Sequence, residues 1–219
     1  MWRGHNREWN LNTPDEKRAY LNFLGEGQMR ICKQFNSLHA LCLMSNHVHE
    51  LYTLDDLATF SNFMRQHHGR YGLFFNRKHQ RQGKVAQDRP KTCAIENDYH
   101  DMIVTFYIHA NPLRAKICGD AKDYLWSSHA LYAFGKKASW MKGIRIQFPK
   151  WYLQLGKTWK ERQANYRKAF DAYLKEHGLR KKELSALGVG SYSWILRRKQ
   201  MLRTLWKQKR LAKVLGPPI

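Results

Sequence analysis

His47 and His49 stand on either side of Val48, in a stretch with the composition of a β-strand. Because side chains alternate across a strand, both imidazoles point to one face while Val48 points to the other. Imidazole binds Zn, Mn, Ni or Cu well and Mg less well, and two histidines leave any of these ions short of ligands. The pair is therefore either part of a metal site that needs a third ligand, or two ordinary histidines of a strand.

Tyr107 and Asn111 are the residues that could complete such a site. They are four residues apart in a predicted helix, so they lie next to each other on one face, together with Val104. A phenol hydroxyl, which can act as a nucleophile, and an amide oxygen, which can bind a metal, would then be presented side by side. The alternative is a half-buried tyrosine and an asparagine near the end of a helix.

The histidine pair is expected in a β-hairpin. Residues 35–44 are apolar, aromatic and small, which indicates a buried strand, and Ser45-Asn46 supplies turn residues before a second strand over 47–53. Ahead of the hairpin, Thr13-Pro14-Asp15-Glu16 combines an N-cap hydroxyl, a proline in the first turn and a glutamate three residues after the cap. These residues predict a helix that Gly25 or Gly27 ends.

Two further helices are expected after the hairpin. Apolar residues recur at helical spacing over 55–75, whereas 77–89 is polar and basic and predicts a loop. A third helix over 97–111 carries Tyr107, and Pro112 should stop it because proline disfavours helical geometry in the preceding residue. Strands and helices in this order predict an α+β fold in which helices cover a sheet.

The charge of the chain indicates a polyanionic partner. Lys and Arg outnumber Asp and Glu by 39 to 17, for a formal charge of +22. Residues 158–219 hold sixteen Lys or Arg and four Asp or Glu, in two predicted helices over 158–177 and 194–214. Nucleic acid is the expected partner, and its binding should weaken with salt as counterions are released. From charge alone, a basic ribosomal or membrane-surface protein is the alternative.

Two classes are not expected. No apolar stretch approaches the roughly 18 to 20 residues of a transmembrane helix, and the first residues lack a signal-peptide core. The four cysteines are scattered without a close pair, so we expect reduced, buried thiols rather than disulfides. The protein is expected to be soluble and intracellular.

Five segments carry a resemblance to a known family. They are Leu43-Met44-Ser45-Asn46-His47-Val48-His49; Phe60 to Met64 with Tyr71 and Phe75-Asn76-Arg77; Gln87 with Arg89; Tyr107-Ile108-His109-Ala110-Asn111-Pro112-Leu113-Arg114-Ala115; and Asp123-Tyr124 with Trp126-Ser127-Ser128. In this order and combination they resemble the REP-associated tyrosine transposases, relatives of the single-tyrosine insertion-sequence transposases. The resemblance covers about residues 3–135.

The resemblance implies a fold, a site and a reaction. The α+β fold would be a ferredoxin-like HUH nuclease domain over 1–145, named for two histidines flanking a hydrophobic residue. Beyond the segment that carries the resemblance, the basic composition predicts a helical, DNA-binding extension over 146–219. His47, His49 and Asn111 would bind a divalent metal, Mg²⁺ or Mn²⁺, and Tyr107 would be the nucleophile. The substrate would be single-stranded DNA carrying a hairpin, cut through a 5′-phosphotyrosine intermediate.

Further expectations follow for the DNA-binding residues and for the setting. Candidate phosphate-binding cations near the site, each of which could equally be a solvated surface charge, are Arg65, Arg70, Arg77, Arg89 and Arg114. In the extension, cations that could follow a DNA backbone are Arg197, Arg198, Lys199, Arg203 and Lys207. No membrane or small-molecule partner is expected, and the protein should be a cytoplasmic, nucleoid-associated monomer or homodimer.

The chain departs from the family pattern at two places. Relatives usually open with a strand ahead of the segment matching Arg3 to Arg7, and that strand is mostly absent here, so the sheet could lack an edge. Glu50 replaces the apolar residue that usually follows the second histidine, and alternation should point it away from the metal. Two other functions therefore stay open: a catalytically silent DNA-binding module of the same fold, and an RNA-binding protein with a structural zinc.

Overall fold

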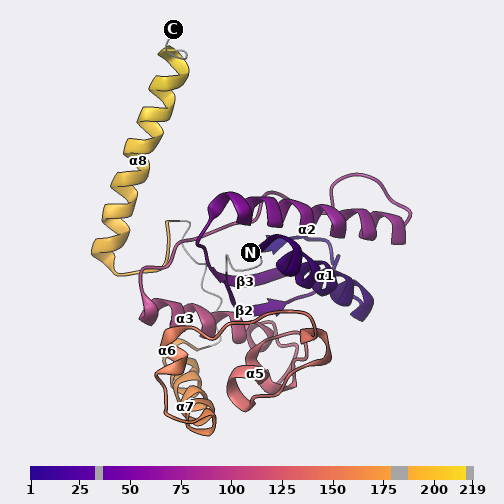
Figure 1. Ribbon diagram of the computed structural model, residues 1–219, viewed down its shortest axis with the longest axis vertical. Helices are drawn as coiled ribbons and strands as arrows, with labels where there is room; N and C mark the ends of the chain where they lie inside the picture. The colour runs from indigo at the N-terminus through magenta and orange to yellow at the C-terminus, as the bar shows by residue number, and fades with distance from the viewer. Residues whose placement is uncertain (33–36, 179–186, 216–219) are drawn as a thin grey trace.

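The computed structural model describes residues 1–32, 37–178 and 187–215, and it is an α+β structure (Figure 1). The strands are β1 (Trp2–Arg3), β2 (Ser37–Leu43) and β3 (His47–Thr53). The helices are α1 (Pro14–Gly27), α2 (Leu57–Lys78), α3 (Asp98–His109), α4 (Asn111–Arg114), α5 (His129–Phe134), α6 (Lys150–Leu153), α7 (Trp159–His177) and α8 (Tyr192–Leu215). Short 3₁₀ or π segments are η1 (His5–Arg7), η2 (Gln28–Cys32), η3 (Ala121–Asp123) and η4 (Ser139–Met141).

The described strands form one antiparallel sheet in the order β1-β3-β2. The predicted hairpin is confirmed: β2 and β3 pair with Cys42 opposite His49, and the Met44 amide donates to the His47 carbonyl at 2.8 Å across the turn. The edge strand β1 has two residues, and Arg3 lies opposite His47. The sheet therefore has a short edge strand beside the histidines, where the sequence had left open whether an edge is missing.

Helices cover both faces of this sheet (Figure 1). On one face, α1 and α2 pack on the side chains of Leu41 and Val48, both fully buried. On the other face, α3 packs on Ala40 and Leu51 together with α5, α6 and α7. Successive residues of β3 thus enter different cores, which is the alternation expected of a strand buried on both sides.

The first of the predicted helices has the expected ends, and the second is longer than expected. α1 begins with the predicted capping box at Thr13 and ends at Gly27. α2, however, is longer than predicted: it continues to Lys78, so Arg77 belongs to its last turn and not to a loop. The physical reason is that no glycine or proline interrupts the chain there, and basic side chains favour the negative end of a helix dipole.

The predicted helix ends ahead of Pro112, as expected, but a second, short helix follows it. α3 ends at His109, but α4 begins at once, with Pro112 in its first turn. The Arg114 amide donates to the Ala110 carbonyl at 3.0 Å across the junction. A proline is tolerated there because the amides of a first helical turn have no partner within the helix. The junction keeps residues 107–114 in one nearly continuous helical segment.

The C-terminal part of the chain contributes to the core. Phe106 of α3 packs against the rings of Tyr166, Phe170 and Tyr173 of α7, with centroid distances of 5.5–5.7 Å. The predicted boundary between a domain over 1–145 and an extension over 146–219 stays a prediction. The described contacts place α7 in the same hydrophobic cluster as α3.

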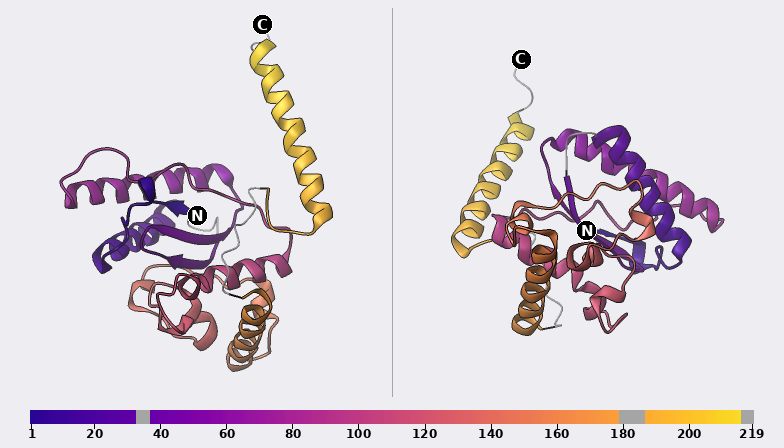
Figure 2. Two further views of the ribbon diagram at one scale, coloured as in Figure 1. Left: turned by 180° about the vertical axis from the view of Figure 1, so that it is seen from behind. Right: turned by 60° about the horizontal axis from the view of Figure 1, so that its bottom comes forward.

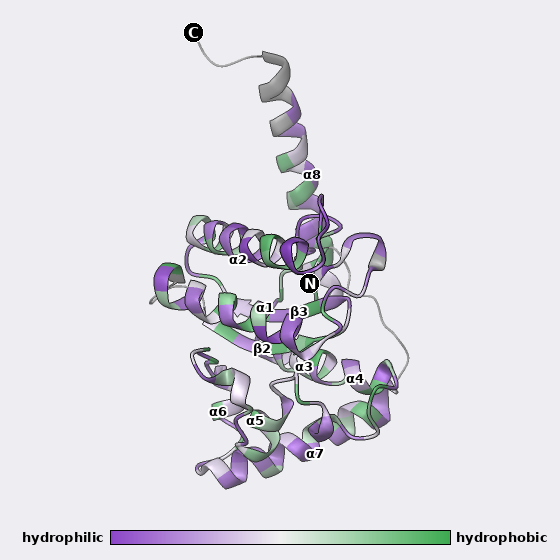
Figure 3. Cartoon of the chain, turned by 90° about the vertical axis from the view of Figure 1, so that its right-hand side faces the viewer, coloured by the Kyte–Doolittle hydropathy of each residue, from purple (hydrophilic) through white to green (hydrophobic). Residues whose placement is uncertain are grey.

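α8 leaves the body of the molecule as a projecting helix (Figure 2). Its start is held by backbone pairing: the Val189 amide donates to the Ala94 carbonyl at 2.9 Å, and the Glu96 amide donates to the Val189 carbonyl at 3.0 Å. The Ser191 hydroxyl donates to Glu96 Oε1 at 3.0 Å. Beyond this attachment, hydrophilic and hydrophobic residues alternate along the helix (Figure 3), and Trp206 is 76% exposed.

In the described ranges, no helix combines the length and the apolar character that crossing a membrane requires. The thiols whose surroundings are described are unpaired: Cys42 is buried, as predicted, whereas Cys93 and Cys118 are partly exposed.

Candidate active site

The two histidines of β3 lie next to each other on the face that α3 covers. The ring centroids of His47 and His49 are 5.0 Å apart and the rings are nearly perpendicular. His49 is buried at 7% exposure and His47 is half-buried, while Val48 points into the opposite core. The alternation of a single strand thus brings two imidazoles together, as predicted from their spacing.

Both histidines have surroundings that suit a metal ligand. The pKa of His49 is held well below its usual value, first by burial and then by the nearby charges of His47, the chain N-terminus, Arg3 and Arg114. His49 is therefore neutral at pH 7, with a lone pair on one ring nitrogen. His47 Nδ1 lies 2.6 Å from Asn46 Oδ1. An N–H donated to Asn46 leaves Nε2 of His47 as the acceptor atom.

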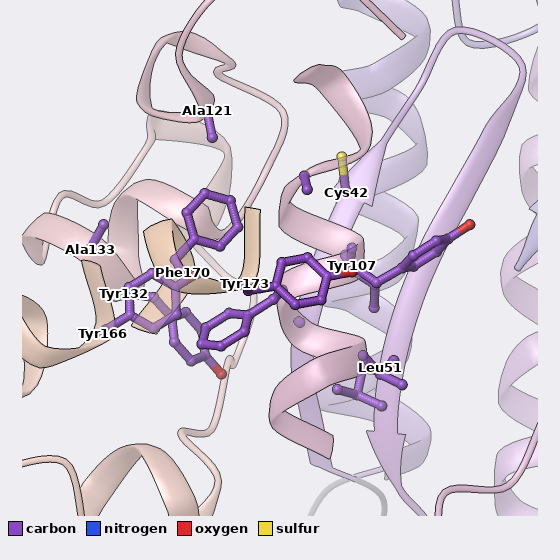
Figure 4. Packing of buried hydrophobic residues seen from close by; sticks show 14 of the residues in the cluster. Cys42, Leu51, Tyr107, Ala121, Tyr132, Ala133, Tyr166, Phe170 and Tyr173 are labelled. Atoms are coloured by element: carbon purple, nitrogen blue, oxygen red, sulfur yellow. The ribbon is translucent and has the colours of Figure 1, made fainter. Parts of the chain in front are cut away.

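Tyr107 reaches this pair from α3. Its ring meets that of His49 edge to face, with centroids 5.6 Å apart, and the residue is 8% exposed. Figure 4 shows its side chain leaving the aromatic cluster around Phe170 and Tyr173, with the hydroxyl at the end that points away from that cluster. The structure thus places the predicted nucleophile against one of the two predicted metal ligands.

Asn111 lies one helical turn from Tyr107. Its Nδ2 donates to the Tyr107 carbonyl at 2.9 Å and to the Ile108 carbonyl at 3.4 Å. The amide nitrogen is therefore turned toward α3, and Oδ1 is the atom left to accept a ligand. Amide orientation follows from this hydrogen bonding.

A divalent metal, which the family resemblance implies, fits the chemistry of these donors. The residues that the structure describes contain no group of three or more His, Cys, Asp or Glu that could hold a metal ion. A metal here would therefore need the Asn111 amide oxygen beside the two imidazoles. Such a nitrogen-rich set suits Mn²⁺ better than Mg²⁺.

Arg114, a predicted phosphate-binding residue, is engaged within the protein. One guanidinium nitrogen donates to the Tyr107 carbonyl at 2.9 Å and another donates to the Tyr173 hydroxyl at 2.9 Å. The guanidinium carbon also lies 4.9 Å from the centroid of the Tyr107 ring. In this arrangement Arg114 contacts the candidate nucleophile directly.

The other predicted cations lie farther out. On α2, Arg65 donates to Asn62 at 2.9 Å, Arg70 forms an ion pair with Glu26 at 2.6 Å, and Arg77 is exposed. Arg89 is exposed in the loop after α2. On α8, four of the predicted residues, Arg197, Lys199, Arg203 and Lys207, are exposed, and Arg198 is partly buried over the Trp194 ring at 5.5 Å.

A second histidine-containing network lies behind the site and is structural. His109 is fully buried, with Nε2 2.7 Å from Ser128 Oγ and Nδ1 2.6 Å from the Tyr166 hydroxyl. Ser128 Oγ also accepts from the Leu41 amide at 3.0 Å. Because Ser128 has no exposed surface, it cannot meet a substrate, and the network instead connects α3 to β2 and α7.

Glu50 takes no part in this site. It lies on the opposite face of β3, where the Tyr20 hydroxyl donates to its carboxylate at 3.0 Å. Burial raises the pKa of Glu50 to about 7. Its position confirms the expectation that it points away from the histidines.

Two residues near the site were missed by the sequence reasoning. Arg3 lies opposite His47, and Tyr173 holds Arg114. Arg3 was missed because a strand of two residues is too short to show the alternation that predicts a strand. Tyr173 was missed because its spacing in α7 matches that of the buried apolar residues, which predicts a core position. The hydroxyl of Tyr173 was the one available hint, since a buried tyrosine usually has a hydrogen-bond partner.

Comparisons of the chain with protein-family models, with curated proteins and with solved structures found no match.

Proposed function

We propose that this protein is a metal-dependent DNA nicking and joining enzyme of the single-tyrosine HUH type, acting on single-stranded or hairpin DNA. The observation that supports it most strongly is the contact of the Tyr107 ring with His49, which in turn lies against His47, from two elements far apart in the sequence. The ferredoxin-like form of the α+β fold and the kinship with REP-associated tyrosine transposases belong to the same proposal.

The proposed reaction is a transesterification. The Tyr107 oxygen attacks a DNA phosphorus, the bond from phosphorus to the 3′ oxygen breaks, and a 5′-phosphotyrosine and a free 3′-hydroxyl result. Because the phosphodiester is exchanged rather than hydrolysed, the strand can be rejoined by the reverse step. A bound Mg²⁺ or Mn²⁺, held by His47, His49 and Asn111, would polarise and orient the scissile phosphate.

Binding and chemistry are assigned to different residues in this proposal. The exposed cations of α8 and of α2 contact phosphates without reading sequence, whereas the tyrosine and histidines act on one phosphodiester. α8 carries no acidic residue over its 24 residues, so its field is uniformly positive. With chromosomal DNA as the substrate, the protein would work in the cytoplasm beside the nucleoid.

The test is covalent capture of DNA. Wild-type protein is incubated with a labelled hairpin oligonucleotide and Mg²⁺ or Mn²⁺, and the expected result is a protein-DNA adduct that survives denaturation. Tyr107→Phe should give no adduct. Tyr99→Phe is the matched control, because Tyr99 lies on the same helix but is 62% exposed at its far end, and it should behave like wild type.

Other outcomes would favour the other functions. DNA binding without an adduct under either metal would indicate a silent binding module. Preferential binding of RNA, with one tightly held zinc per chain and no cleavage of DNA, would indicate an RNA-binding protein.

A further inference from the structure

The Arg114 guanidinium lies between two tyrosines from different parts of the chain. It donates to the backbone carbonyl of Tyr107 and to the side-chain hydroxyl of Tyr173, each at 2.9 Å. Its carbon lies 4.9 Å from the Tyr107 ring centroid and 5.7 Å from that of Tyr173. One cation therefore contacts both the ring and the backbone of the candidate nucleophile.

Tyr173 is a firmly held partner for this cation. It is 5% exposed, its ring lies 5.5 Å from that of Phe106, and His177 stacks on it at 4.5 Å. A buried ring packed on two sides has little freedom to move. The Tyr173 hydroxyl thus offers Arg114 a fixed acceptor on α7.

Arg114 depends on this acceptor for its orientation. The Nε atom of Arg114 is buried and has no hydrogen-bond partner among the described residues. The two terminal donors and the two rings therefore determine where the guanidinium sits. Without the Tyr173 hydroxyl, one end of the planar group would be released, and it could swing away from the Tyr107 ring.

We propose that Arg114 and Tyr173 are positioning residues for Tyr107, so that α7 takes part in aligning the nucleophile. This inference rests on the proposed function, in which the Tyr107 oxygen must lie in line with a phosphodiester. Small misplacements of a reacting group cost large factors in rate. The inference also gives α7, which lies outside the segment resembling the transposases, a role in the reaction.

The first experiment measures single-turnover adduct formation over a range of oligonucleotide concentrations. Loss of one hydrogen bond to a charged group should lower the maximal rate of Tyr173→Phe about tenfold. The half-saturating DNA concentration should stay within about twofold, because binding resides in the basic surface. Arg114→Lys, which keeps the charge without the planar fork, should lose less rate than Arg114→Met.

Two matched controls separate positioning from a general effect of substitution. Tyr99→Phe removes a hydroxyl from an exposed tyrosine at the start of α3. Arg162→Lys changes a guanidinium that lies 4.9 Å over the Trp159 ring and donates to the Leu153 and Gly156 carbonyls, far along α7 from Tyr173. Both variants should retain the wild-type rate.

The second experiment needs no DNA. The protein has 11 tyrosines, and labelling with 3-fluorotyrosine gives each a fluorine resonance. The signal of Tyr107 is assigned as the one missing from Tyr107→Phe. It should shift in Tyr173→Phe and in Arg114→Lys, and it should stay in place in Tyr99→Phe. Unchanged positions of most other resonances show that a variant is folded.

The inference requires both results. A Tyr173→Phe protein with the rate of the controls would overturn it, and so would a lowered rate without movement of the Tyr107 resonance, since the effect would then arise elsewhere. If wild-type protein forms no adduct, the proposed function fails, and the fluorine experiment alone decides whether Tyr173 and Arg114 hold Tyr107.

Discussion

The histidines of this protein lie in two different kinds of surroundings, the candidate site and the hydrophobic core. His47 and His49 face α3 and the candidate nucleophile, whereas His67 lies under α1 on the opposite side of the sheet, 1% exposed. His67 Nε2 is 3.0 Å from the Tyr20 carbonyl, to which it donates, and its Nδ1 has no partner among the described residues. The first two thus belong to the candidate site, and the third is a core residue that is neutral at pH 7.

The metal-ligand assignment predicts a separation between cutting and binding. His47→Ala should abolish adduct formation, because one of only three proposed ligands is lost. Its affinity for a hairpin oligonucleotide, measured by fluorescence anisotropy, should stay close to that of wild type, because phosphate contacts supply the affinity. His100→Ala, at the N-terminal end of α3, is the control. A parallel loss of binding in His47→Ala would contradict the assignment.

His67 predicts a dependence of stability on pH. Burial lowers the pKa of His67 to about 4 in the folded protein, while the unfolded chain titrates near 6.5. Between these values the unfolded state binds more protons, so stability is full above about pH 6.5 and falls as the pH drops toward 4. The contribution of this residue at the acid end is roughly 2–4 kcal/mol.

The measurement is urea unfolding at several pH values for wild type and His67→Gln. Glu50 has the opposite effect on the free energy of unfolding, because burial raises its pKa to about 7 in the folded protein. As the pH rises from about 4.5 to 7, the folded protein keeps the Glu50 proton more strongly than the unfolded chain, so stability falls with rising pH. The comparison with His67→Gln isolates the histidine from this opposing effect. The variant should lose less stability than wild type between pH 6.5 and 4, and equal slopes would refute the assignment.

At the scale of elements, α3 is fixed by a buried polar network as well as by apolar packing. His109 joins Ser128 and Tyr166, and Ser128 in turn joins the backbone of Leu41 in β2. Burial, with the neighbouring His129, holds the pKa of His109 well below its usual value. The imidazole is therefore neutral, and it donates through one nitrogen and accepts through the other.

Ser128→Ala should destabilise the protein by about 1–3 kcal/mol, because it leaves a buried ring nitrogen of His109 without a partner. The free energy of unfolding is measured by chemical denaturation. Ser193→Ala, at an exposed position of α8, should change it by less than about 0.5 kcal/mol. If the two variants are equally stable, the network contributes nothing to the attachment of α3.

Local rules predicted the elements better than their junctions. The alternation around Val48 and the turn residues Ser45-Asn46 were sufficient for the hairpin and for the shared face of the histidines. The proline rule placed the end of α3 two residues beyond its last residue, His109, but it did not predict α4, because a first helical turn tolerates proline. The contacts of Arg114 could not be predicted from the sequence. They depend on the packing of α7 beside α3, and no short-range sequence pattern indicates that packing.

At the scale of the whole molecule, the predicted DNA-binding cations of α8 lie apart from the candidate site. The described cations of α8 lie on a helix that projects from the body (Figure 2), and Trp206 exposes a large aromatic surface among them. The site itself lies between the sheet and α3. DNA that contacts both must therefore extend across more than one surface of the protein.

This separation predicts the salt dependence of binding. Replacing Arg203 and Lys207 together with glutamine should weaken DNA binding and reduce the log-log salt slope by about 1.4 to 1.8, at roughly 0.7 to 0.9 per lost phosphate contact. Replacing the exposed Lys160 and Lys168 of α7 with glutamine removes the same charge and should leave the slope closer to that of wild type. Equal slopes for the two pairs would show that α8 does not bind DNA.

The attachment of α8 beside α3 has a mechanical consequence. α8 has 24 residues, about 36 Å at 1.5 Å per residue, which is close to one turn of duplex DNA. Its base is anchored to Glu96, directly ahead of Asn97, the N-cap of the helix that carries Tyr107. α8 would thus act as a lever arm for a duplex bound along it. A torque on that duplex would be transmitted to the N-terminal end of α3, the helix that carries Tyr107.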